Sequence, residues 1–460
     1  MVKIIFIIAV TVFAVIPASA VAAAKPNIIV ILADDLGYAD VGYHQSNDVS
    51  SPNIDRLAKN GSYFSAGYAM APVCGPSRAG LLTGRYQNRF GFEDNPGGPF
   101  RQNSKVKPGI PKSEVNLGEQ LQSLGYATAW IGKDHQGKDE DFHPNNRGFE
   151  RFFGFIDGAS TYYTSTSKKQ KLQRDKQPLV EGEYLTDAFG REAVSFIKEN
   201  AKNPFFLYLP FNAVHGPLEA KPEDLAKFSH VQNKARRTML AMHHAMDRSI
   251  GLVYNTLEQL NLVDNTLIVF YSDNGGKPIK GHSGNASLNT PLKGQKGSLL
   301  EGGIRVPFLM HWPKRIAANN RVDFPVAAID VFPTVLAATG DDVKPGNKLD
   351  GINLLPYLTE ELKAPAGRNL YWRFLYQWAV RDNDWKLVKL KGVKQPELYH
   401  LSKDISEQHN VAKQFPQIVK RLEQQFNTWS ARMMQPQWSW QARFGGNYNV
   451  NKAKKIINKG

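Results

Sequence analysis

The sequence has almost no cysteine and few long apolar segments, and each shortage excludes a class of protein. Cys74 is the single cysteine among 460 residues, so no disulfide can form within the chain and a disulfide-stapled scaffold is excluded. Beyond the N-terminus, no apolar segment approaches the length of a membrane span. Glycine and proline, 38 and 27 residues, follow no period, which excludes collagen-like and low-complexity chains. With 42% hydrophobic and 22% charged residues, the chain is also too apolar to be disordered.

The first twenty residues are typical of an export signal. Lys3 is followed by an apolar run from Ile4 to Ile16 and then by the small residues Ala18, Ser19 and Ala20. This order predicts a signal peptide over residues 1–20 with cleavage after small residues. The apolar run is too short to remain as a membrane-spanning helix. We therefore expect a periplasmic or secreted protein without a membrane anchor.

Acidic residues are the minority charge. Lys and Arg total 57 against 42 Asp and Glu, a net charge of +15. Part of this excess lies in the tail 446–460, which carries four lysines and no acid and is predicted to be a solvated, frayed end. The body remains basic, and for an exported protein this favours an acidic polysaccharide over nucleic acid as the partner.

Short apolar runs alternate with helical patterns over most of the chain, which predicts an α/β fold. The runs are rich in Ile, Val and Phe, as in strands buried on both faces, and indicate a large, mostly parallel sheet sandwiched by helices. We expect strands at 27–32, 127–131, 205–209 and 266–271, and helices at 53–59, 117–124, 187–199 and 235–260. These elements form a predicted catalytic domain over residues 25–355.

The pattern changes in the C-terminal part. Short, aromatic, turn-separated runs at 371–376, 378–381, 385–390 and 397–401 predict an antiparallel sheet. Residues 414–433 follow as one amphipathic helix. A smaller subdomain of sheet plus helix is therefore expected over residues 365–445.

Chemically useful residues follow each of the four predicted strands of the large sheet. They are Asp34 and Asp35, then Lys133 and His135, then His215, and finally Asp273 and Asn274. The carboxyl ends of parallel strands lie at one edge of the sheet, where ligands bind. These four distant segments are therefore expected to meet at one site.

The acidic members of this set point to a metal. Asp34–Asp35 alone, or Asp273–Asn274 alone, is an ordinary turn or helix-cap composition. Carboxylates brought together repel one another, so either one stays protonated or a divalent cation neutralises them. Oxygen ligands favour Ca²⁺ or Mg²⁺ over zinc.

The lone cysteine lies in a suggestive context. Pro76 suits the first turn of a helix and residues 77–82 continue it, which places Cys74 at a helix N-terminus, where an anion is favoured. A lone cysteine is usually a small buried hydrophobe. Here Arg78 lies one helical turn away on the same face.

The motif Cys-x-Pro-Ser-Arg followed by Leu-Thr-Gly resembles the signature of the type I, formylglycine-dependent sulfatases of the alkaline phosphatase-like superfamily. Five further motifs of that family occur in its order, at 27–37 (NIIVILADDLG), 132–135 (GKDH), 146–149 (NRGF), 272–276 (SDNGG) and 292–307 (LKGQKGSLLEGGIRVP). Six short motifs in order are improbable by chance. The resemblance covers nearly the whole mature chain and is that of a bacterial polysaccharide sulfatase.

The resemblance implies a nucleophile and a metal site. Cys74 would be oxidised by a separate formylglycine-generating enzyme to Cα-formylglycine, whose hydrate is the nucleophile. One Ca²⁺ would be held by Asp34, Asp35, Asp273 and Asn274, with an oxygen of the modified Cys74. The substrate would be the sulfate ester of a carbohydrate, polysaccharide or oligosaccharide.

The resemblance also assigns the surrounding cations. Arg78 and Lys133 would stabilise the hydrate, His135 would be its base, and His215 and Lys296 would contact the sulfate and the leaving oxygen. Lys293 could also reach the site, although the spacing to the Glu-Gly-Gly sequence favours Lys296. One departure stands out, since many relatives have Trp-His-Leu-Gly where this chain has Asp-His-Gln-Gly at 134–137; a packing or substrate contact there is expected to differ.

Other functions remain open from the sequence. A phosphonate or phosphate monoester hydrolase of the same superfamily would use the same metal, oxygen nucleophile and cations. A catalytically silent, calcium-dependent glycan-binding protein would keep the metal site and leave the thiol of Cys74 intact. A thiol hydrolase using Cys74 with His135 or His215 is disfavoured, because nothing in it needs the carboxylates.

Overall fold

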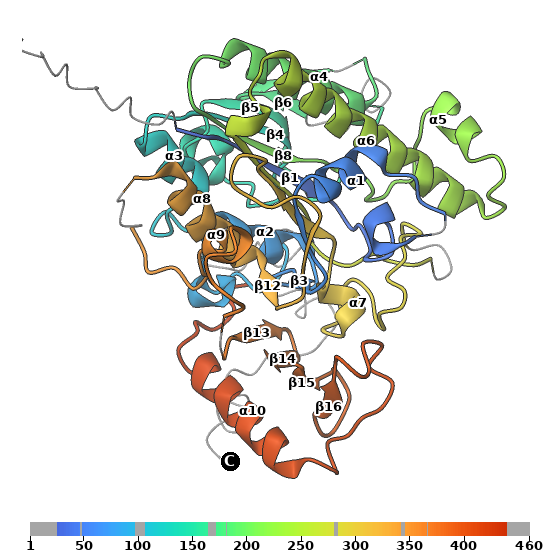
Figure 1. Cartoon of the computed structure of the whole chain (residues 1–460), viewed down its shortest axis with the longest axis vertical. Coiled ribbons are helices and arrows are strands. Elements are labelled where there is room, and N and C mark those ends of the chain that lie inside the picture. The colour runs from blue at the N-terminus through green and yellow to red at the C-terminus, as the bar shows by residue number, and fades with distance from the viewer. Residues whose placement is uncertain are drawn as a thin grey trace, which may run out of the picture.

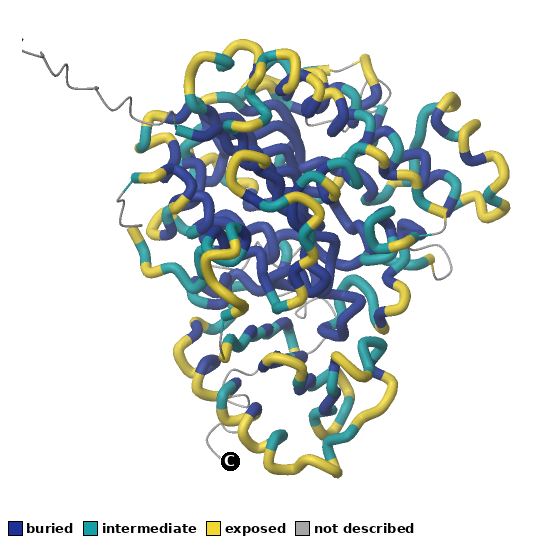
Figure 2. Tube along the Cα trace, viewed as in Figure 1, coloured by how far each residue is buried: buried dark blue, intermediate teal, exposed yellow. Residues whose placement is uncertain are grey.

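Continuous apolar strands build one large sheet at the centre of the molecule. The computed structural model describes residues 25–46, 48–96, 106–163, 172–180, 182–279, 284–341, 346–365 and 367–438; the predicted signal peptide and basic tail lie outside them. The sheet has ten strands in the order β11-β2-β10-β9-β1-β8-β4-β5-β6-β7. Its buried centre is enclosed by helices whose outer surfaces are exposed (Figure 2).

The five central strands are parallel. They are β9 (Thr266–Ser272), β1 (Asn27–Ala33), β8 (Phe205–Pro210), β4 (Ala127–Lys133) and β5 (Arg151–Phe155). The four strands expected from sequence are confirmed, and each runs one or two residues beyond its predicted end. Parallel strands that are buried on both faces have apolar side chains at nearly every position. This pattern is why the four strands could be predicted from the sequence.

The edges of the sheet mix strand directions. On one side lie β10 (Phe308–His311), β2 (Ser62–Phe64) and β11 (Asn320–Val322), with β10 antiparallel to both neighbours. On the other lie the antiparallel β6 (Leu172–Arg174) and β7 (Gln177–Pro178). A separate parallel pair joins β3 (Gly67–Tyr68) and β12 (Val326–Ala327). The sheet is mostly parallel, as expected.

Helices cover both faces of the sheet (Figure 1). One face carries α1 (Pro52–Lys59), α4 (Leu185–Glu199) and α6 (Lys234–Gln259), with α5 (Pro222–Lys227) beside α6. The other carries α2 (Cys74–Thr83), α3 (Leu117–Ser123), α8 (Val331–Thr339) and α9 (Leu355–Leu358). Within β1 the side chains alternate between two cores, with Ile28 and Val30 in one and Ile29 and Ile31 in the other. Strand periodicity therefore divides the apolar residues between the two helical layers.

The C-terminal part forms a second, smaller sheet. Strands β13 (Asn369–Phe374), β14 (Gln377–Asp382), β15 (Trp385–Lys389) and β16 (Glu397–His400) pair antiparallel in sequence order. Helix α10 (Pro416–Ser430) packs on this sheet, with the Trp378 and Phe426 rings stacked 4.4 Å apart. The predicted antiparallel sheet plus helix is confirmed, and it lies below the main sheet in Figure 1.

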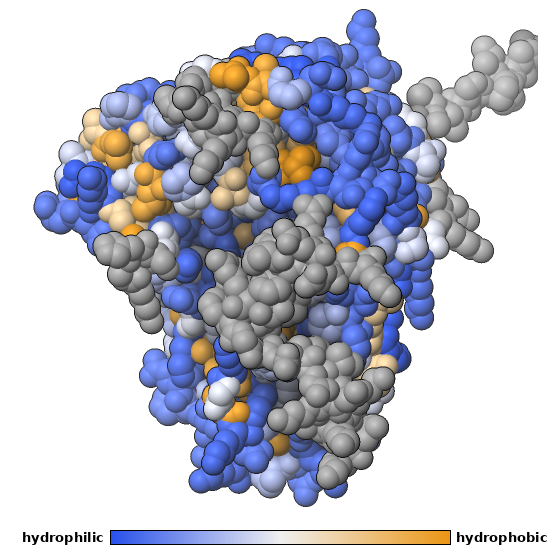
Figure 3. All heavy atoms as spheres, turned by 180° about the vertical axis from the view of Figure 1, so that it is seen from behind, coloured by the Kyte–Doolittle hydropathy of each residue, from blue (hydrophilic) through white to orange (hydrophobic). Residues whose placement is uncertain are grey.

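The surface of the described residues is largely polar. Viewed from behind, hydrophilic side chains dominate and apolar ones gather only in small groups (Figure 3). Across the described part of the chain, no helix combines the length and the apolar character that crossing a bilayer requires.

Candidate active site

The carboxyl ends of β1 and β9 bring the two acidic pairs together. Because the two strands are adjacent and in register up to Ala33 and Ser272, Asp34–Asp35 and Asp273–Asn274 emerge side by side. The backbone N–H of Asp35 donates to Asp273 Oδ1 at 3.2 Å, and Asn274 Nδ2 donates to Asp35 Oδ1 at 2.7 Å. Segments that are 238 residues apart thus share one cluster.

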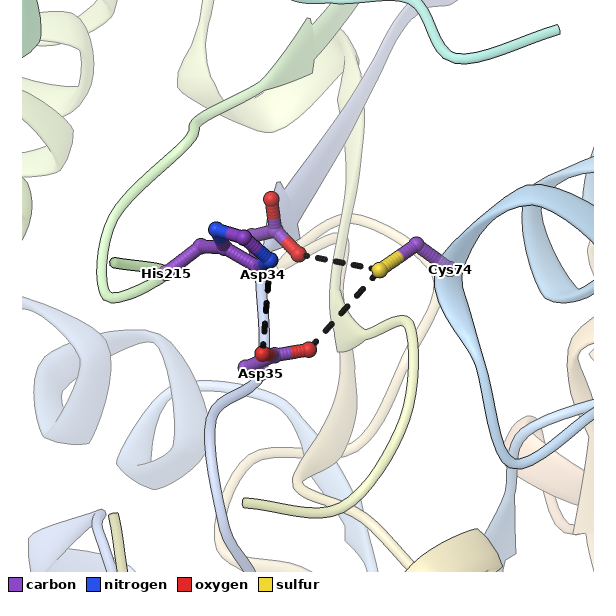
Figure 4. Close-up of side chains that lie close together, drawn as sticks. All are labelled: Asp34, Asp35, Cys74 and His215. Carbon is purple, nitrogen blue, oxygen red and sulfur yellow. Dashed lines mark hydrogen bonds and ion pairs between the residues drawn. The ribbon is translucent and has the colours of Figure 1, made fainter. Parts of the chain in front are cut away.

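Cys74 faces this cluster from the first residue of α2. Its Sγ lies 3.4 Å from Asp34 Oδ1 and 3.8 Å from Asp35 Oδ1 (Figure 4). The residue before it, Val73, is extended, so the helix begins at Cys74. Burial raises the pKa of the Cys74 thiol well above its usual value, although Lys133 and Lys296 oppose this shift. The unmodified side chain is therefore a protonated thiol at neutral pH, which is a poor nucleophile.

Three buried cations neutralise the carboxylates. Lys133 forms an ion pair with Asp34. The Lys296 ammonium lies 2.6 Å from Asp35 Oδ1 and 3.1 Å from Cys74 Sγ. Arg78 donates from Nε to the second oxygen of Asp273 at 2.8 Å, and its charged group thus lies against a carboxylate rather than the thiol.

The pKa values of the three carboxyl groups separate. Burial alone would raise the pKa of Asp34, but the nearby Lys133, with His215 and Arg78, outweighs it and holds the pKa below its usual value. The pKa of Asp35 is lowered in the same way, and Lys296 is the main charge that opposes the effect of burial. For Asp273, burial and the negative charge of Asp34 outweigh Arg78 and raise the pKa to about 6. Like-charge repulsion among the carboxylates is thus only partly offset by the protein's own cations.

His215 lies at the entrance of the cluster. Its Nε2 lies 3.7 Å from Asp35 Oδ2, and the side chain is 24% exposed. Its Nδ1 lies 2.7 Å from the carbonyl oxygen of Gly216; because a carbonyl can only accept, Nδ1 carries a proton and Nε2 is left facing the site. Burial lowers the pKa of His215, although Asp34 and Asp35 oppose the shift.

His135 lies at the same sheet edge, two residues after the end of β4. Its backbone has a left-handed φ of 62°, and burial lowers the pKa of its ring well below the usual value. Its Nδ1 has no hydrogen-bond partner among the residues that the structure describes. A Cβ at Gly158 would come within 2.5 Å of His135 Nε2, so glycine is needed there for this ring to fit.

The donor set suits a hard divalent cation. Ligand atoms of Asp34, Asp35, Cys74 and His215 all lie within 4.8 Å of one another. Asn274 Oδ1 is buried and has no hydrogen-bond partner within the described ranges, so an amide oxygen at this site lacks the partner that burial normally demands. Carboxylate and amide oxygens are the ligands that calcium prefers.

Several supporting residues were not found from the sequence. Asn95 accepts the backbone N–H of Gly75, and Gln136 donates to the Gly75 carbonyl, which explains the departure noted at 134–137 as a packing contact beside Cys74. Asn285 donates to the carbonyls of both Asp35 and Val214 and so links two of the loops of the site. Asn95 and Asn285 are polar residues in loops, and nothing in their sequence neighbourhood marks them, whereas Gln136 is part of the departure at 134–137.

Lys293 points away from the cluster. Its ammonium donates to the carbonyl oxygen of Glu407 at 3.0 Å, in the C-terminal part of the chain. Of the two lysines in the segment 293–297, it is Lys296 that reaches Cys74, in agreement with the expectation from spacing.

This arrangement can bind an anion and direct a nucleophile at it. The N-terminus of α2 and the Lys296 ammonium lie beside Cys74, and Lys133 and Arg78 lie against the neighbouring carboxylates. Such donors stabilise charge that develops in a transition state. His215 presents a ring nitrogen on the open side, where it can transfer a proton.

Comparisons with known proteins find one family over most of the chain. Residues 26–341 match the family model described as Sulfatase, and residues 295–432 match the model of the C-terminal part of N-sulphoglucosamine sulphohydrolase. Arylsulfatase J of Mus musculus is 30% identical over 396 residues, which are 79% of this chain and 64% of the relative. N-acetylgalactosamine-6-sulfatase of Homo sapiens is 34% identical over an alignment of 355 residues, which covers 73% of this chain and 66% of the relative. The chain thus spans about two thirds of the length of these curated relatives.

A solved structure is similar over almost the full length. The crystal structure of Ps i-CgsB in complex with k-i-k-neocarrahexaose has a TM-score of 0.87 and 38% sequence identity to this chain. The match covers 94% of this chain and 99% of that one.

Proposed function

The chain belongs to the sulfatase family, and we propose that it is a sulfuric ester hydrolase that removes sulfate from a sulfated carbohydrate by cleaving the S–O bond. One observation carries the proposal: Cys74 begins α2 inside a cluster of three carboxylates and three buried cations. A calcium-dependent binding protein needs the carboxylates for its metal. It does not require Cys74 at the start of α2 with Lys296 beside it.

We propose that Cys74 is converted to Cα-formylglycine by a maturation enzyme and that the site holds one Ca²⁺. The raised pKa of the thiol supports the first part, since an unmodified Cys74 would remain protonated. The hydrated aldehyde supplies a hydroxyl nucleophile. Asp34, Asp35, Asp273, Asn274 and an oxygen of the modified Cys74 would hold the calcium, which would supply positive charge that lowers the pKa of that hydroxyl.

The remaining residues handle charge and protons. Arg78, Lys133 and Lys296 would stabilise the negative charge on the nonbridging sulfate oxygens. His215, whose Nε2 faces the site, would deliver a proton to the departing alkoxide from its protonated form, which the charges of Asp34 and Asp35 favour against burial. His135 would accept a proton from the nucleophile during release of the product sulfate.

The proposed substrate is an oligosaccharide or polysaccharide rather than a small metabolite. The net charge of +15 favours an extended anionic partner. Ps i-CgsB, 38% identical, binds k-i-k-neocarrahexaose, and we therefore propose a sulfated oligosaccharide of this kind as the substrate. The predicted signal peptide over residues 1–20 further suggests action in the periplasm or outside the cell.

The test is release of sulfate by the purified, matured protein. Sulfate from k-i-k-neocarrahexaose and from an aryl sulfate is measured by ion chromatography, beside matched aryl phosphate and phosphonate esters. We expect sulfate release at least about a hundredfold faster than phosphate release, since that is the discrimination a dedicated site reaches. Preferred cleavage of the phosphorus esters would instead identify the chain as a phosphonate or phosphate monoester hydrolase.

Mass spectrometry of the tryptic peptide Asn60–Arg78 checks the nucleophile. We expect the mass in which the thiol-bearing side chain of Cys74 has become an aldehyde. An intact thiol, together with calcium-dependent retention on a glycan column and no sulfate release, would support the glycan-binding alternative and refute hydrolysis.

A further inference from the structure

The loop that carries Lys296 is held by a residue from the C-terminal sheet. Gln377 is the first residue of β14 and is buried. Its Nε2 donates to the carbonyl oxygen of Gly297 at 2.9 Å, and its Oε1 accepts the backbone N–H of Leu299 at 3.3 Å. One side chain thus satisfies two backbone groups, and the first of them belongs to the residue directly after Lys296.

The same piece of backbone is tied on its other side to the loops of the active site. The N–H of Gly297 donates to the carbonyl of Pro72 at 2.8 Å, two residues before Cys74. The N–H of Lys296 donates to the carbonyl of Gly276 at 3.1 Å, in the loop that follows Asn274. The Lys296 backbone is therefore clamped between the loops that precede Cys74 and follow Asn274 and, across from them, the C-terminal sheet.

A second anchor holds the end of this loop, where α7 (Glu301–Ile304) begins. Lys386 of β15 pairs with Glu301 at 2.8 Å and with Glu407 at 2.9 Å, and all three side chains are buried. The backbone N–H of Glu301 donates to Glu407 Oε2 at 2.6 Å. Since Lys293 also reaches the Glu407 carbonyl, the C-terminal part contacts both ends of the loop as well as its middle.

We propose that Gln377 is a positioning residue that fixes the Lys296 ammonium against Asp35 and the nucleophile. The inference rests on the proposed function, because it takes Lys296 to stabilise the sulfate in the transition state. A lysine side chain has four rotatable bonds, so its head group is placed accurately only if its backbone is fixed. Misplacement of a reacting group by about 1 Å can cost about 100-fold in rate. Gln377 does not touch the substrate. Through its effect on Lys296, the C-terminal sheet nevertheless contributes to catalysis.

The main experiment compares Gln377→Ala, Lys296→Ala and the double variant in the matured holoenzyme with an aryl sulfate. We expect Gln377→Ala to lower kcat by about 10- to 100-fold with little change in KM, because the lost interaction is with the transition state. In the Lys296→Ala background, Gln377→Ala should add less than about twofold, because the group it positions is absent. Losses that multiply in the double variant would overturn the proposal.

One further substitution separates positioning from packing. Gln377→Met keeps the length of the side chain and loses both hydrogen bonds, so we expect it to be as slow as Gln377→Ala; wild-type kcat in Gln377→Met would overturn the proposal. It also guards against a folding defect, since a side chain of similar volume fills the same buried space. Each variant is checked for an unchanged thermal midpoint, and kcat is compared at a temperature where all are folded.

Control variants in the same subdomain test whether any damage there has this effect. Arg421→Ala breaks the ion pair between α10 and Asp382 of β14, and Gln424→Ala changes an exposed residue of α10. Both should keep wild-type kcat; a loss in either as large as that of Gln377→Ala would overturn a specific role for Gln377. The failures are distinguishable, because an inactive wild-type protein refutes the proposed function, whereas an active wild type with equally active Gln377 variants refutes only the positioning.

Discussion

Removing the buried ammonium of Lys386 is expected to destabilise the C-terminal subdomain strongly and in a pH-dependent manner. Lys386 is fully buried between Glu301 and Glu407. Burial alone would raise the pKa of Glu301, but Lys386 with Arg305 and Arg381 outweighs it and lowers the pKa to about 2. Burial raises the pKa of Glu407 to about 7, against the effect of Lys386. The Lys386→Met substitution therefore leaves two buried carboxyl groups without their shared cation.

The magnitude follows from the loss of one partner in a buried ion pair, which costs about 3–5 kcal/mol. The value for Lys386→Met should lie near the lower end, because Arg305 still contacts Glu301. Without the lysine, burial holds the pKa of Glu407 above its unfolded value. A carboxyl group with a raised pKa in the folded state stabilises the fold below its unfolded pKa and loses that contribution as the pH rises through the folded pKa. The loss of stability is thus expected to be larger at pH 8 than at pH 5.

Urea unfolding followed by tryptophan fluorescence measures this effect. Four of the eight tryptophans, namely Trp372, Trp378, Trp385 and Trp429, lie in the C-terminal sheet and helix, so the signal includes that part of the chain. Arg421→Ala, which breaks a partly exposed pair, is the control and should cost only about 0.2–1 kcal/mol. The reasoning is refuted if Lys386→Met costs less than about 1 kcal/mol at pH 8, or equally much at both pH values.

Three further predictions concern the active site. Asn274→Ala removes a buried amide oxygen that has no partner in the described part of the chain, and we expect calcium affinity, measured by titration calorimetry, to fall at least about tenfold; unchanged affinity would exclude Asn274 as a ligand. His215→Ala should lower kcat by about 10²–10⁴-fold for a sugar sulfate but far less for an aryl sulfate, whose leaving group needs no proton; equal losses for both in a steady-state assay would contradict the general-acid role. Cys74→Ser, produced without the maturation enzyme, should give at most one equivalent of sulfate in a burst experiment, and sustained turnover would disprove the proposed nucleophile.

The centre of the fold was predictable from sequence because its physical signal is local. A parallel strand buried on both faces is apolar at nearly every position, and the predicted runs at β1, β4, β8 and β9 come close to this condition, with Asn27, Thr128 and Thr266 as polar exceptions. The strands β2, β6 and β11, near the edges of the sheet, have three residues each. Such short segments carry no periodicity, so only tertiary pairing defines them.

The cluster of site residues was predictable for a related reason. Since parallel strands end at one edge, the polar residues after β1 and β9 had to meet, and the structure places Asp35 and Asp273 in contact. The different contacts of Lys293 and Lys296 were harder to predict. Both lysines lie in one loop, and only the tertiary structure brings Lys293 to Glu407 and Lys296 to Asp35 and Cys74. Gln377 could not be found at all, since its partners Gly297 and Leu299 lie 80 and 78 residues away and only the packing of the second sheet brings them together.

The charges of the described site explain why the proposed metal and the proposed anionic substrate would belong together. The three carboxylates of Asp34, Asp35 and Asp273 carry three negative charges. Their ion-pair partners carry three positive charges, on Lys133, Lys296 and Arg78 respectively. Without a metal these charges balance, so that only individual donors such as Lys296 attract a sulfate ester, and burial with the charge of Asp34 still raises the pKa of Asp273 to about 6. Two more positive charges at the carboxylate oxygens would ionise Asp273 fully and leave the site net positive. The carboxylates would then no longer fully neutralise the lysines and the arginine, and these cations would be available to the sulfate oxygens. Hydrolysis of an anionic ester requires such positive charge at the site.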